Sequence, residues 1–193
     1  MKKDTKDKIL AAATSLMTER GYSNVSVKDI ALTAGVSEMT VFRHFETKMG
    51  ILQAVLDRHS YIPYFEQLFA QDLSGNLVND LQQIANAYLA FMEKNKAIFL
   101  ITTQDRSILS GVMDLISDSQ TKQLLKLLEG YFQVQIQQRK MKDIDTNGQA
   151  TVFLTSLFGF FVSNAFWDDH FLKNQKESFV DHLVATFVGG VCI

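Results

Sequence analysis

The sequence contains few of the residues that interrupt a helix or cross-link a chain. Its 193 residues include one proline, Pro63, and ten glycines, a composition that favours long helices over strands joined by frequent turns. The single cysteine, Cys192, excludes a disulfide within the chain and is typical of proteins of the reducing cytoplasm. No segment alternates apolar and polar residues as a half-buried strand does. The sequence therefore predicts an all-α protein of about nine helices.

The short motifs of common catalytic and metal sites are also missing. There is no Gly-x-Ser-x-Gly, no glycine-rich phosphate loop and no pair of cysteines. Residues 143–148 (Asp-Ile-Asp-Thr-Asn-Gly) resemble the start of a calcium-binding loop. Leu154 stands where the bidentate carboxylate belongs, so capping of the following helix is the preferred interpretation. We expect no enzymatic activity, no metal and no cofactor.

The overall charge does not indicate a nucleic-acid-binding protein, but the distribution of the charges is informative. The formal net charge is -2. Residues 1–60 carry nine Lys and Arg against seven Asp and Glu, whereas residues 61–193 carry ten against fourteen. The mildly basic front supports DNA binding at the N-terminal end. The charged start of the sequence, MKKDTKDK, is unlike a signal peptide, and we expect a cytoplasmic protein.

One uncharged stretch, residues 150–167, approaches the length of a membrane-spanning helix. Five polar residues, among them Ser163 and Asn164, interrupt it, and Asp168 and Asp169 close it. Because that many polar groups are costly in lipid, the stretch is interpreted as a helix buried on all sides by protein.

Local signals divide the first 60 residues into four helices. Apolar residues at helical spacing predict a helix over about residues 5–20. Ser26 and Ser37 are the predicted N-caps of two short helices, and Thr47 is the predicted N-cap of a longer one. Gly35 lies between the two short helices, where a sharp turn is expected to require a positive φ.

The composition changes after about residue 60. Pro63 is expected to end or kink the fourth helix, and thirteen of the fifteen phenylalanines lie beyond it. We therefore expect two domains, residues 1–60 and residues 61–193. In the second, apolar periodicity predicts helices over about residues 77–94, 97–109, 117–141, 147–168 and 175–190.

Two short helices joined by a glycine-containing turn can present the second helix to a DNA major groove. The run from Val25 to Lys48, VSVKDIALTAGVSEMTVFRHFETK, resembles the signature of the TetR family, S/T-V-x-x-I-A-x-x-A-G-V-S followed by T-x-Y-x-H/Y-F-x-S/T-K. The resemblance covers about residues 8–56. It implies an N-terminal three-helix helix-turn-helix domain that binds DNA, and a C-terminal helical domain that binds a ligand and dimerises.

Two residues depart from the family pattern, and a third is an acid on the surface that would face DNA. Phe42 replaces a tyrosine, so a hydroxyl contact to phosphate is absent. Gly50 stands where an acidic capping residue is common, which is expected to weaken the start of that helix. Glu38 directs an acid toward polyanionic DNA. These departures suggest weaker affinity or an unusual base preference.

The resemblance assigns roles by position. Glu38 would accept a hydrogen bond from a cytosine amino group, and Met39 would contact a thymine methyl group. Other residues would meet phosphates and set the position of the protein on the duplex. The DNA-binding residues implied are Ser26, Lys28, Ser37, Glu38, Met39, Thr40, Phe42, Arg43, His44 and Lys48.

The last two long helices are implied to form a four-helix bundle with their copies in a second subunit. Their apolar stripes agree, since a monomer would leave much of this surface in water. Two-fold symmetry then implies a palindromic operator. The expected interface residues are Leu157, Phe158, Phe160, Phe179, Leu183 and Phe187.

The surplus of phenylalanine and methionine suggests a pocket for an apolar or aromatic ligand. Most aromatic residues at helical spacing are core residues, so the wall of the pocket is less specific than the DNA-binding motif. The candidates are Phe65, Phe69, Tyr88, Phe91, Phe99, Tyr131, Phe132, Phe161 and Trp167.

The sequence thus predicts a ligand-responsive transcriptional regulator, a repressor by family habit, that binds operator DNA as a homodimer and is released by a small molecule. Two alternatives stay open. One is a helical enzyme that uses the aromatic pocket, and the other is a small-molecule-binding protein whose N-terminal unit no longer binds DNA. A salt-dependent DNA shift assay separates them.

Overall fold

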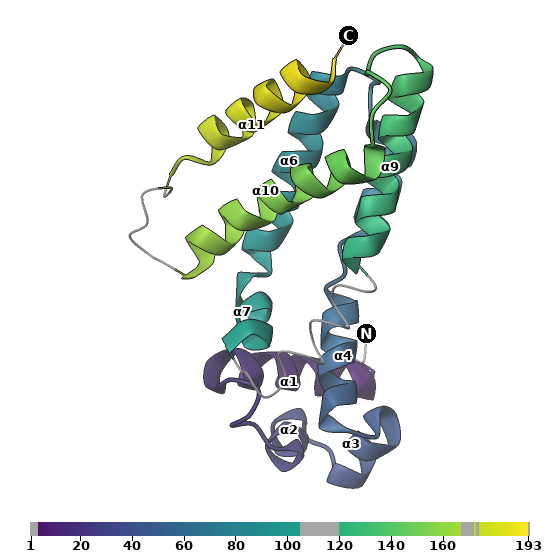
Figure 1. Ribbon diagram of the computed structural model, residues 1–193. Helices are drawn as coiled ribbons and strands as arrows, with labels where there is room; N and C mark the ends of the chain where they lie inside the picture. Colours follow the sequence, from purple (N-terminus) through teal and green to yellow (C-terminus); the bar gives the residue numbers. More distant parts are fainter. Residues whose placement is uncertain (1–3, 105–119, 167–171, 173, 193) are drawn as a thin grey trace. The chain divides into compact units, whose positions relative to one another are not determined.

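The computed structural model describes residues 4–104, 120–166, 172 and 174–192. Within these ranges the residues form helices joined by turns, without a strand, and the all-α fold expected from the sequence is confirmed (Figure 1). The described residues pack into two units. Residues 4–60 with 95–104 make the first, and residues 61–94 with the described part of 120–192 make the second.

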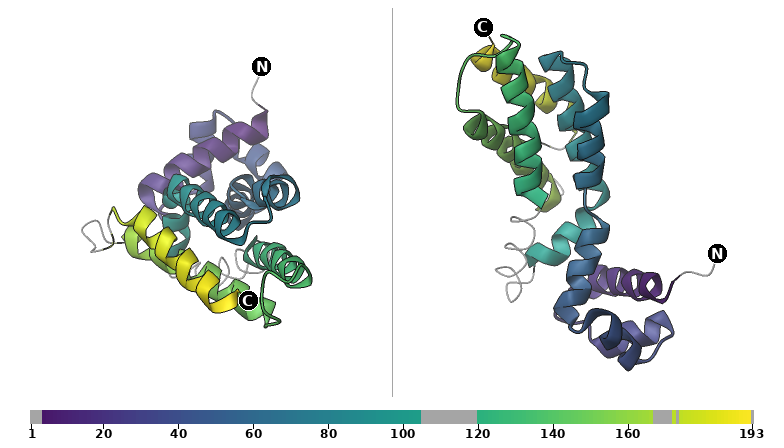
Figure 2. Two further views of the ribbon diagram at one scale, coloured as in Figure 1. Left: turned by 90° about the horizontal axis from the view of Figure 1, so that it is seen from above. Right: turned by 90° about the vertical axis from the view of Figure 1, so that its right-hand side faces the viewer.

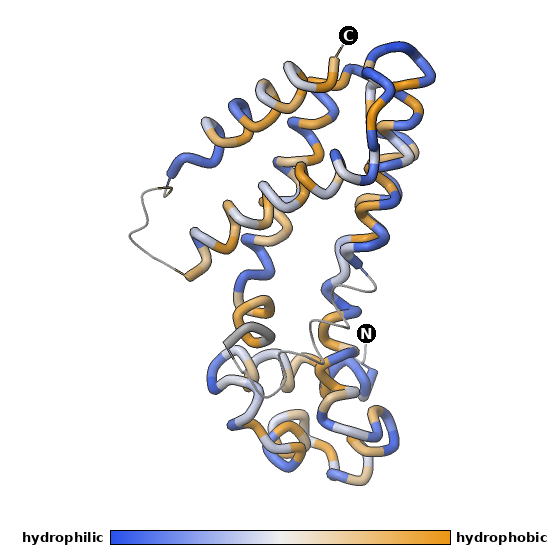
Figure 3. Tube along the Cα trace, in the orientation of Figure 1, coloured by the Kyte–Doolittle hydropathy of each residue, from blue (hydrophilic) through white to orange (hydrophobic). Residues whose placement is uncertain are grey.

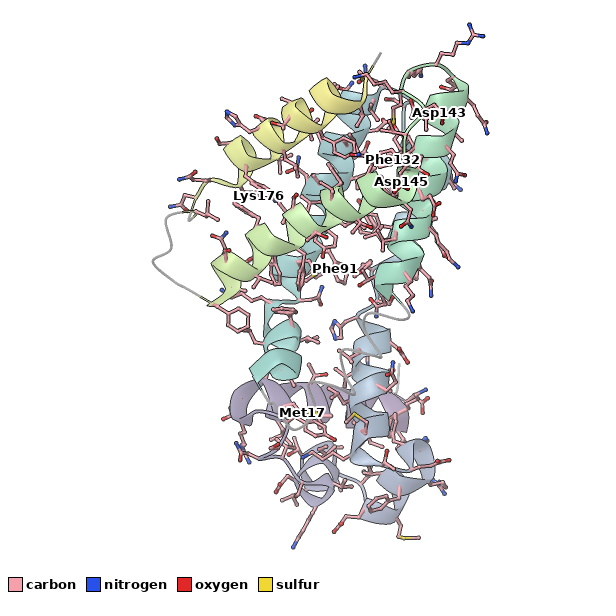
Figure 4. All side chains as sticks on the ribbon, viewed as in Figure 1. Met17, Phe91, Phe132, Asp143, Asp145 and Lys176 are labelled. Atoms are coloured by element: carbon pink, nitrogen blue, oxygen red, sulfur yellow. The ribbon has the colours of Figure 1, made fainter. Side chains whose placement is uncertain are left out.

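The first unit is built on α1 (Thr5–Arg20), whose inner face is fully buried at Ile9, Ala13 and Met17 (Figure 4). Three further helices pack against α1, namely α2, α4 and α7. The short α3 packs between α2 and α4. The bounds of these helices are Val27–Ala34 for α2, Glu38–Phe45 for α3, Lys48–Arg58 for α4 and Lys96–Gln104 for α7.

Helix α7 belongs to the first unit although it lies beyond residue 60. Its Ile98 and Ile101 are buried in the same hydrophobic core as the side chains of α1 and α4. The predicted domain boundary at residue 60 had placed this helix in the second domain, whereas the structure packs it with the first. An apolar stripe predicts that a helix is packed, but it does not say against which element.

Two glycines shape the helix junctions of the first unit. Gly35 adopts the left-handed conformation, with φ 67° and ψ 38°, and its amide bonds back to the last turn of α2. A positive φ costs other residues energy, so this turn favours glycine as predicted. At the α3–α4 junction, Thr47 caps α4 by accepting a hydrogen bond from the Gly50 amide at 2.9 Å.

The role of Gly50 is steric. A Cβ at this position would overlap the backbone carbonyl oxygen of Phe45 and would lie 3.3 Å from Oγ1 of Thr47. The α3–α4 turn is therefore closed so tightly that a side chain has no room. An acidic residue here would add charge to the helix start only by opening the turn, because no Cβ fits the observed geometry.

The second unit begins with α5 (Ile62–Gln67), which continues into a π-helical turn, η1 (Leu68–Asp72). Pro63 lies in the first turn of α5, and α4 has already ended at Arg58. Pro63 was expected to end or kink the fourth helix, and instead it begins a new one. Proline suits a first turn because its missing amide has no helical partner there and its φ is already helical.

The core of the second unit forms where α10 packs against α6 and α9, and α11 packs against α6 (Figures 1 and 2). Phe132 on α9 stacks on Phe187 of α11 at 5.4 Å, and Phe153 of α10 meets the same ring edge-on at 5.3 Å. The bounds are Leu77–Lys94 for α6, Lys122–Gln137 for α9, Thr146–Phe166 for α10 and Lys176–Val191 for α11.

Helix α10 is the uncharged stretch noted in the sequence, and hydrophobic residues run along most of it (Figure 3). Among the described helices it is long and apolar enough to cross a membrane by length and composition, with 39% of its most apolar window buried. One side, including Phe153, Leu157 and Phe161, is buried within the chain. The opposite side exposes Val152 and Phe158, so a single chain does not surround the helix completely.

A buried carboxylate organises the turn between η1 and α6. Asp80 is only 1% exposed, and its two oxygens accept hydrogen bonds from the Ser74 amide and hydroxyl and from the Gly75 amide, each at 2.8 Å. The hydroxyl of Tyr131 on α9 donates a fourth bond at 2.7 Å. Burial raises the pKa of Tyr131, and the hydrogen bond to Asp80 and its charge raise it further, so the phenol stays a donor.

We expect Gly50→Ala to lower the free energy of unfolding of the first unit by about 1–3 kcal/mol, because the new Cβ would collide with a backbone oxygen. Urea unfolding followed by circular dichroism measures the change. Gly130→Ala on α9 is the matched control, since a Cβ there meets nothing within 4 Å. The control should gain about 0.5–1 kcal/mol. Equal effects of the two substitutions would contradict the steric role of Gly50.

Tyr131→Phe should destabilise the second unit by about 1–3 kcal/mol, because it removes one donor from a buried carboxylate. The same urea experiment measures it. Tyr64→Phe removes a hydroxyl from an exposed tyrosine of α5 and should change stability by less than about 0.5 kcal/mol. If Tyr131→Phe is as silent as Tyr64→Phe, the hydroxyl does not support the carboxylate.

Candidate nucleic-acid interface

Helices α2 and α3 are each eight residues long and are held by their caps. The Ser26 hydroxyl accepts from the Asp29 amide at 3.0 Å, and the Asp29 carboxylate accepts from the Ser26 amide at 2.9 Å. The hydrogen bond from the Ser26 side chain lowers the pKa of Asp29, and the bond from its amide adds to this. Ser37 accepts from the Thr40 amide at 3.2 Å. The predicted caps Ser26 and Ser37, like Thr47, are confirmed.

Helix α3 has one buried face and one exposed face. Val41 and Phe45 are buried in the core of the first unit. The other face carries Met39, which is 78% exposed, and Phe42, which is 43% exposed. Glu38, Arg43 and His44 are exposed as well, and Thr40 is half-buried. The predicted residues of α3 are therefore accessible in this chain, apart from the half-buried Thr40.

The basic residues around α3 come from neighbouring helices. Lys28 is exposed on α2. Lys48 begins α4, and its Nζ lies 4.1 Å from the centroid of the buried Tyr22 ring. Such a cation–π contact restricts the ammonium group while leaving it charged. Tyr22 was not predicted, because the motif gives no signal that an aromatic residue 26 positions earlier supports Lys48.

A second residue that the sequence analysis missed is Leu32. It lies on α2, one turn after Lys28, and is 81% exposed. Ile30 and Ala31 beside it are buried. The helical period alone could have indicated that Leu32 points away from the core, on the same face as Lys28.

Six of the nine aromatic residues predicted to line a ligand pocket are linked, together with Tyr61, by ring contacts in the second unit. Phe65, Phe132, Phe161 and Tyr88 are buried core residues of the second unit, and Phe91 packs edge-on against Tyr61. Phe99 belongs to α7 of the first unit, and Trp167 lies outside the described residues. The remaining two, Phe69 and Tyr131, line a cavity of about 350 Å³ in the second unit.

The residues predicted for a dimer interface are also divided. Leu157, Phe160 and Phe187 are buried within the chain. Phe158 is 38% exposed on α10. Phe179 and Leu183 are half-buried on α11, and Phe179 stacks on Phe160 at 4.1 Å.

The segment that resembles a calcium loop caps a helix, as preferred from the sequence. The Asp145 carboxylate accepts from the Asn147 amide at 3.1 Å at the start of α10 (Figure 4). Among the described residues, no three His, Cys, Asp or Glu side chains are grouped so that they could hold a metal ion. Asp168, Asp169 and His170, three neighbouring residues of types that can bind metals, lie outside the described residues.

Comparisons with known proteins agree with this geometry. Residues 9–55 match the model of a family described as bacterial regulatory proteins, tetR family. Over 187 residues the chain is 28% identical to the HTH-type transcriptional regulator YvkB of Bacillus subtilis (strain 168), with 97% of each chain covered.

Two solved structures share the fold along nearly the whole chain. A TetR-family transcriptional regulator from Mesorhizobium loti superposes with a TM-score of 0.78 at 20% identity, covering 98% of this chain and 97% of that one. The flavonoid-responsive regulator FrrA superposes with a TM-score of 0.76 at 19% identity, covering 97% of each. These proteins are named as regulators and not as enzymes, as the sequence predicted. The capped helix-turn-helix within residues 9–55 is that of the tetR family of bacterial regulatory proteins, and along nearly its full length the chain is similar to a transcriptional regulator and to TetR-family structures.

Proposed function

We propose that this chain is a repressor that binds palindromic operator DNA as a homodimer and leaves it when a small apolar or aromatic molecule binds. Residues 1–60 would contact the DNA, and residues 61–193 would dimerise and bind the effector. The observation that carries the DNA-binding part is the division of α3, with Val41 and Phe45 buried and Glu38, Met39 and Arg43 exposed. A helix held in this way can enter a major groove without disturbing its own core.

On the exposed face, Glu38 and Met39 occupy the first turn of α3, where side chains reach base edges. Ser26, Lys28, Thr40, His44 and Lys48 surround this turn and would contact phosphates, with Ser37, Phe42 and Arg43 completing the surface. The Tyr22 ring limits the movement of Lys48, which lowers the entropy lost when its ammonium group meets a phosphate. Phe42 can offer its ring but no hydroxyl.

The proposed dimer would use the outward side of α10. Thr155, Phe158 and Phe166 are exposed there at intervals of three and eight residues, which places them near one helix face. On α11 the exposed Ala185 and Gly189 are small, so a second helix could approach closely. Leu157, Phe160 and Phe187 would support this face from within the chain.

The effector is proposed to act by selecting one conformation of the second unit. A molecule that binds two conformations with affinities differing by a few kcal/mol shifts their populations, and with them the spacing of the two DNA-binding units. FrrA is named for its response to flavonoids, which are flat aromatic molecules. That name and the aromatic content of the second unit support an aromatic effector here.

An enzymatic function is not favoured. It would need a polar constellation in a cavity, and the relatives are regulators of transcription. A small-molecule-binding protein that has lost DNA binding is not favoured either, because the exposed face of α3 keeps its basic and polar residues.

The DNA-binding proposal is tested with a duplex selected from a random-sequence library. Wild-type affinity should fall steeply with salt, and Lys28→Ala should reduce the slope of log K against log salt by about 0.9 for each phosphate that the variant no longer neutralises. Met39→Ala should change the preferred bases and leave the slope unchanged.

Lys126→Ala is the control, since this exposed lysine lies on α9 in the second unit. If wild-type protein selects no duplex, or if Lys28→Ala and Lys126→Ala give the same slope, the proposed interface is wrong.

The dimer proposal is tested by Phe158→Asp, which places a charge at the centre of the exposed face of α10. We expect a monomer at micromolar concentration in sedimentation experiments, because an unpaired buried charge is costly at an interface. Val78→Asp changes a valine of α6 with similar exposure and should leave the dimer intact. A Phe158→Asp protein that still sediments as a dimer would rule out this face.

A further inference from the structure

The second unit contains a cavity of about 350 Å³ between η1, the turn that follows it and α9. Apolar and aromatic side chains share its wall with two glutamines and two glycines. The lining residues that matter below are Phe69, Leu73, Gly130, Tyr131, Val134 and Gln135. All of them belong to the second unit, so the cavity does not depend on how the two units are placed.

Gln135 is the unusual member of this wall. It is only 2% exposed, and its Oε1 is buried without a hydrogen-bond partner among the described residues. Buried carbonyl oxygens are normally paired, and an unpaired one is costly. Gln135 contributes to the lining, but in this structure its Oε1 is covered. The last bond of a glutamine side chain turns easily, so the carboxamide can rotate to meet a donor in the cavity.

The aromatic part of the wall is fixed in place. The ring of Tyr131 packs edge-on against Phe69 with their centroids 6.1 Å apart. Its hydroxyl is held by Asp80, which also holds the turn at Ser74 and Gly75. Gly130 precedes Tyr131 on α9, and a Cβ there would meet no atom within 4 Å, so this part of the wall leaves space.

We propose that this cavity binds a small molecule with a flat apolar body and an N–H or O–H donor, the body against Phe69 and Tyr131 and the donor bonded to Gln135. The inference rests on the proposed function, because it names the chemistry of the effector. The same site would connect ligand binding to a change in conformation, because a ligand in contact with Tyr131 touches the residue that supports Asp80 and the turn before α6.

The test uses the full chain and three pairs of probes that differ by one methyl group: phenol and anisole, indole and 1-methylindole, 2-naphthol and 2-methoxynaphthalene. Dissociation constants come from titrations followed by NMR. In the wild type the donor member of each pair should bind about tenfold more tightly than its methylated partner.

Three variants locate the site. Gln135→Leu should reduce the tenfold preference to below about twofold while the methylated probes bind as before. Gln133→Leu makes the same change at an exposed position of the same helix and should keep the preference. Gly130→Leu should fill the cavity and weaken all six probes by at least about tenfold.

The proposal is overturned if no probe binds, if the two members of each pair bind equally, if Gln135→Leu behaves like Gln133→Leu, or if Gly130→Leu binds as the wild type does. Gln135→Leu and Gly130→Leu are independent, so failure of one to fold leaves the other. The same preparations are assayed for DNA binding. If the probes do not bind as expected but the protein binds DNA, only the proposed ligand site is wrong. If the wild type binds no DNA, the proposed function is wrong.

Discussion

An eight-residue helix is too short to be stable alone. Helix α3 has this length and must nevertheless be stable while one of its faces is exposed to solvent. Its orientation depends on the burial of Val41 and Phe45 in a core supplied mostly by α1 and α4. The caps at Ser37 and Thr47 and the tight turn at Gly50 then fix where the helix begins and ends. The rest of the first unit is arranged around this constraint. The exposed face can vary in sequence because it carries little of the stability.

The first unit was predicted well from sequence because its signals are local. A serine or threonine before a helix, and a glycine at a sharp turn, act within a few residues of where they stand. The caps at Ser26, Ser37 and Thr47 were therefore predictable, as was the left-handed Gly35. The steric role of Gly50 was not, because it depends on the carbonyl of Phe45 across the turn.

The second unit was less predictable because its decisive contacts join distant positions. Asp80 and Tyr131 are 51 residues apart, and no pattern in the sequence connects them. Aromatic residues at helical spacing were expected to line a pocket, and four of the nine, Phe132 among them, are buried in the core. Periodicity predicts that a side chain faces the interior, but it does not distinguish a packed core from the wall of a cavity. Pro63 was ambiguous for a similar reason, since proline can follow one helix or open the next.

The carboxylate of Asp80 receives bonds of two kinds. Those from the amides of Ser74 and Gly75 come from the backbone, which substitution leaves in place as long as the turn keeps its shape. The bonds from the hydroxyls of Tyr131 and Ser74 are encoded by side chains. In lineages that keep this arrangement, residues 80 and 131 should therefore change together or not at all, and residue 74 should keep a hydroxyl. Covariation between these two positions, 51 residues apart, would then be explained by a single buried carboxylate.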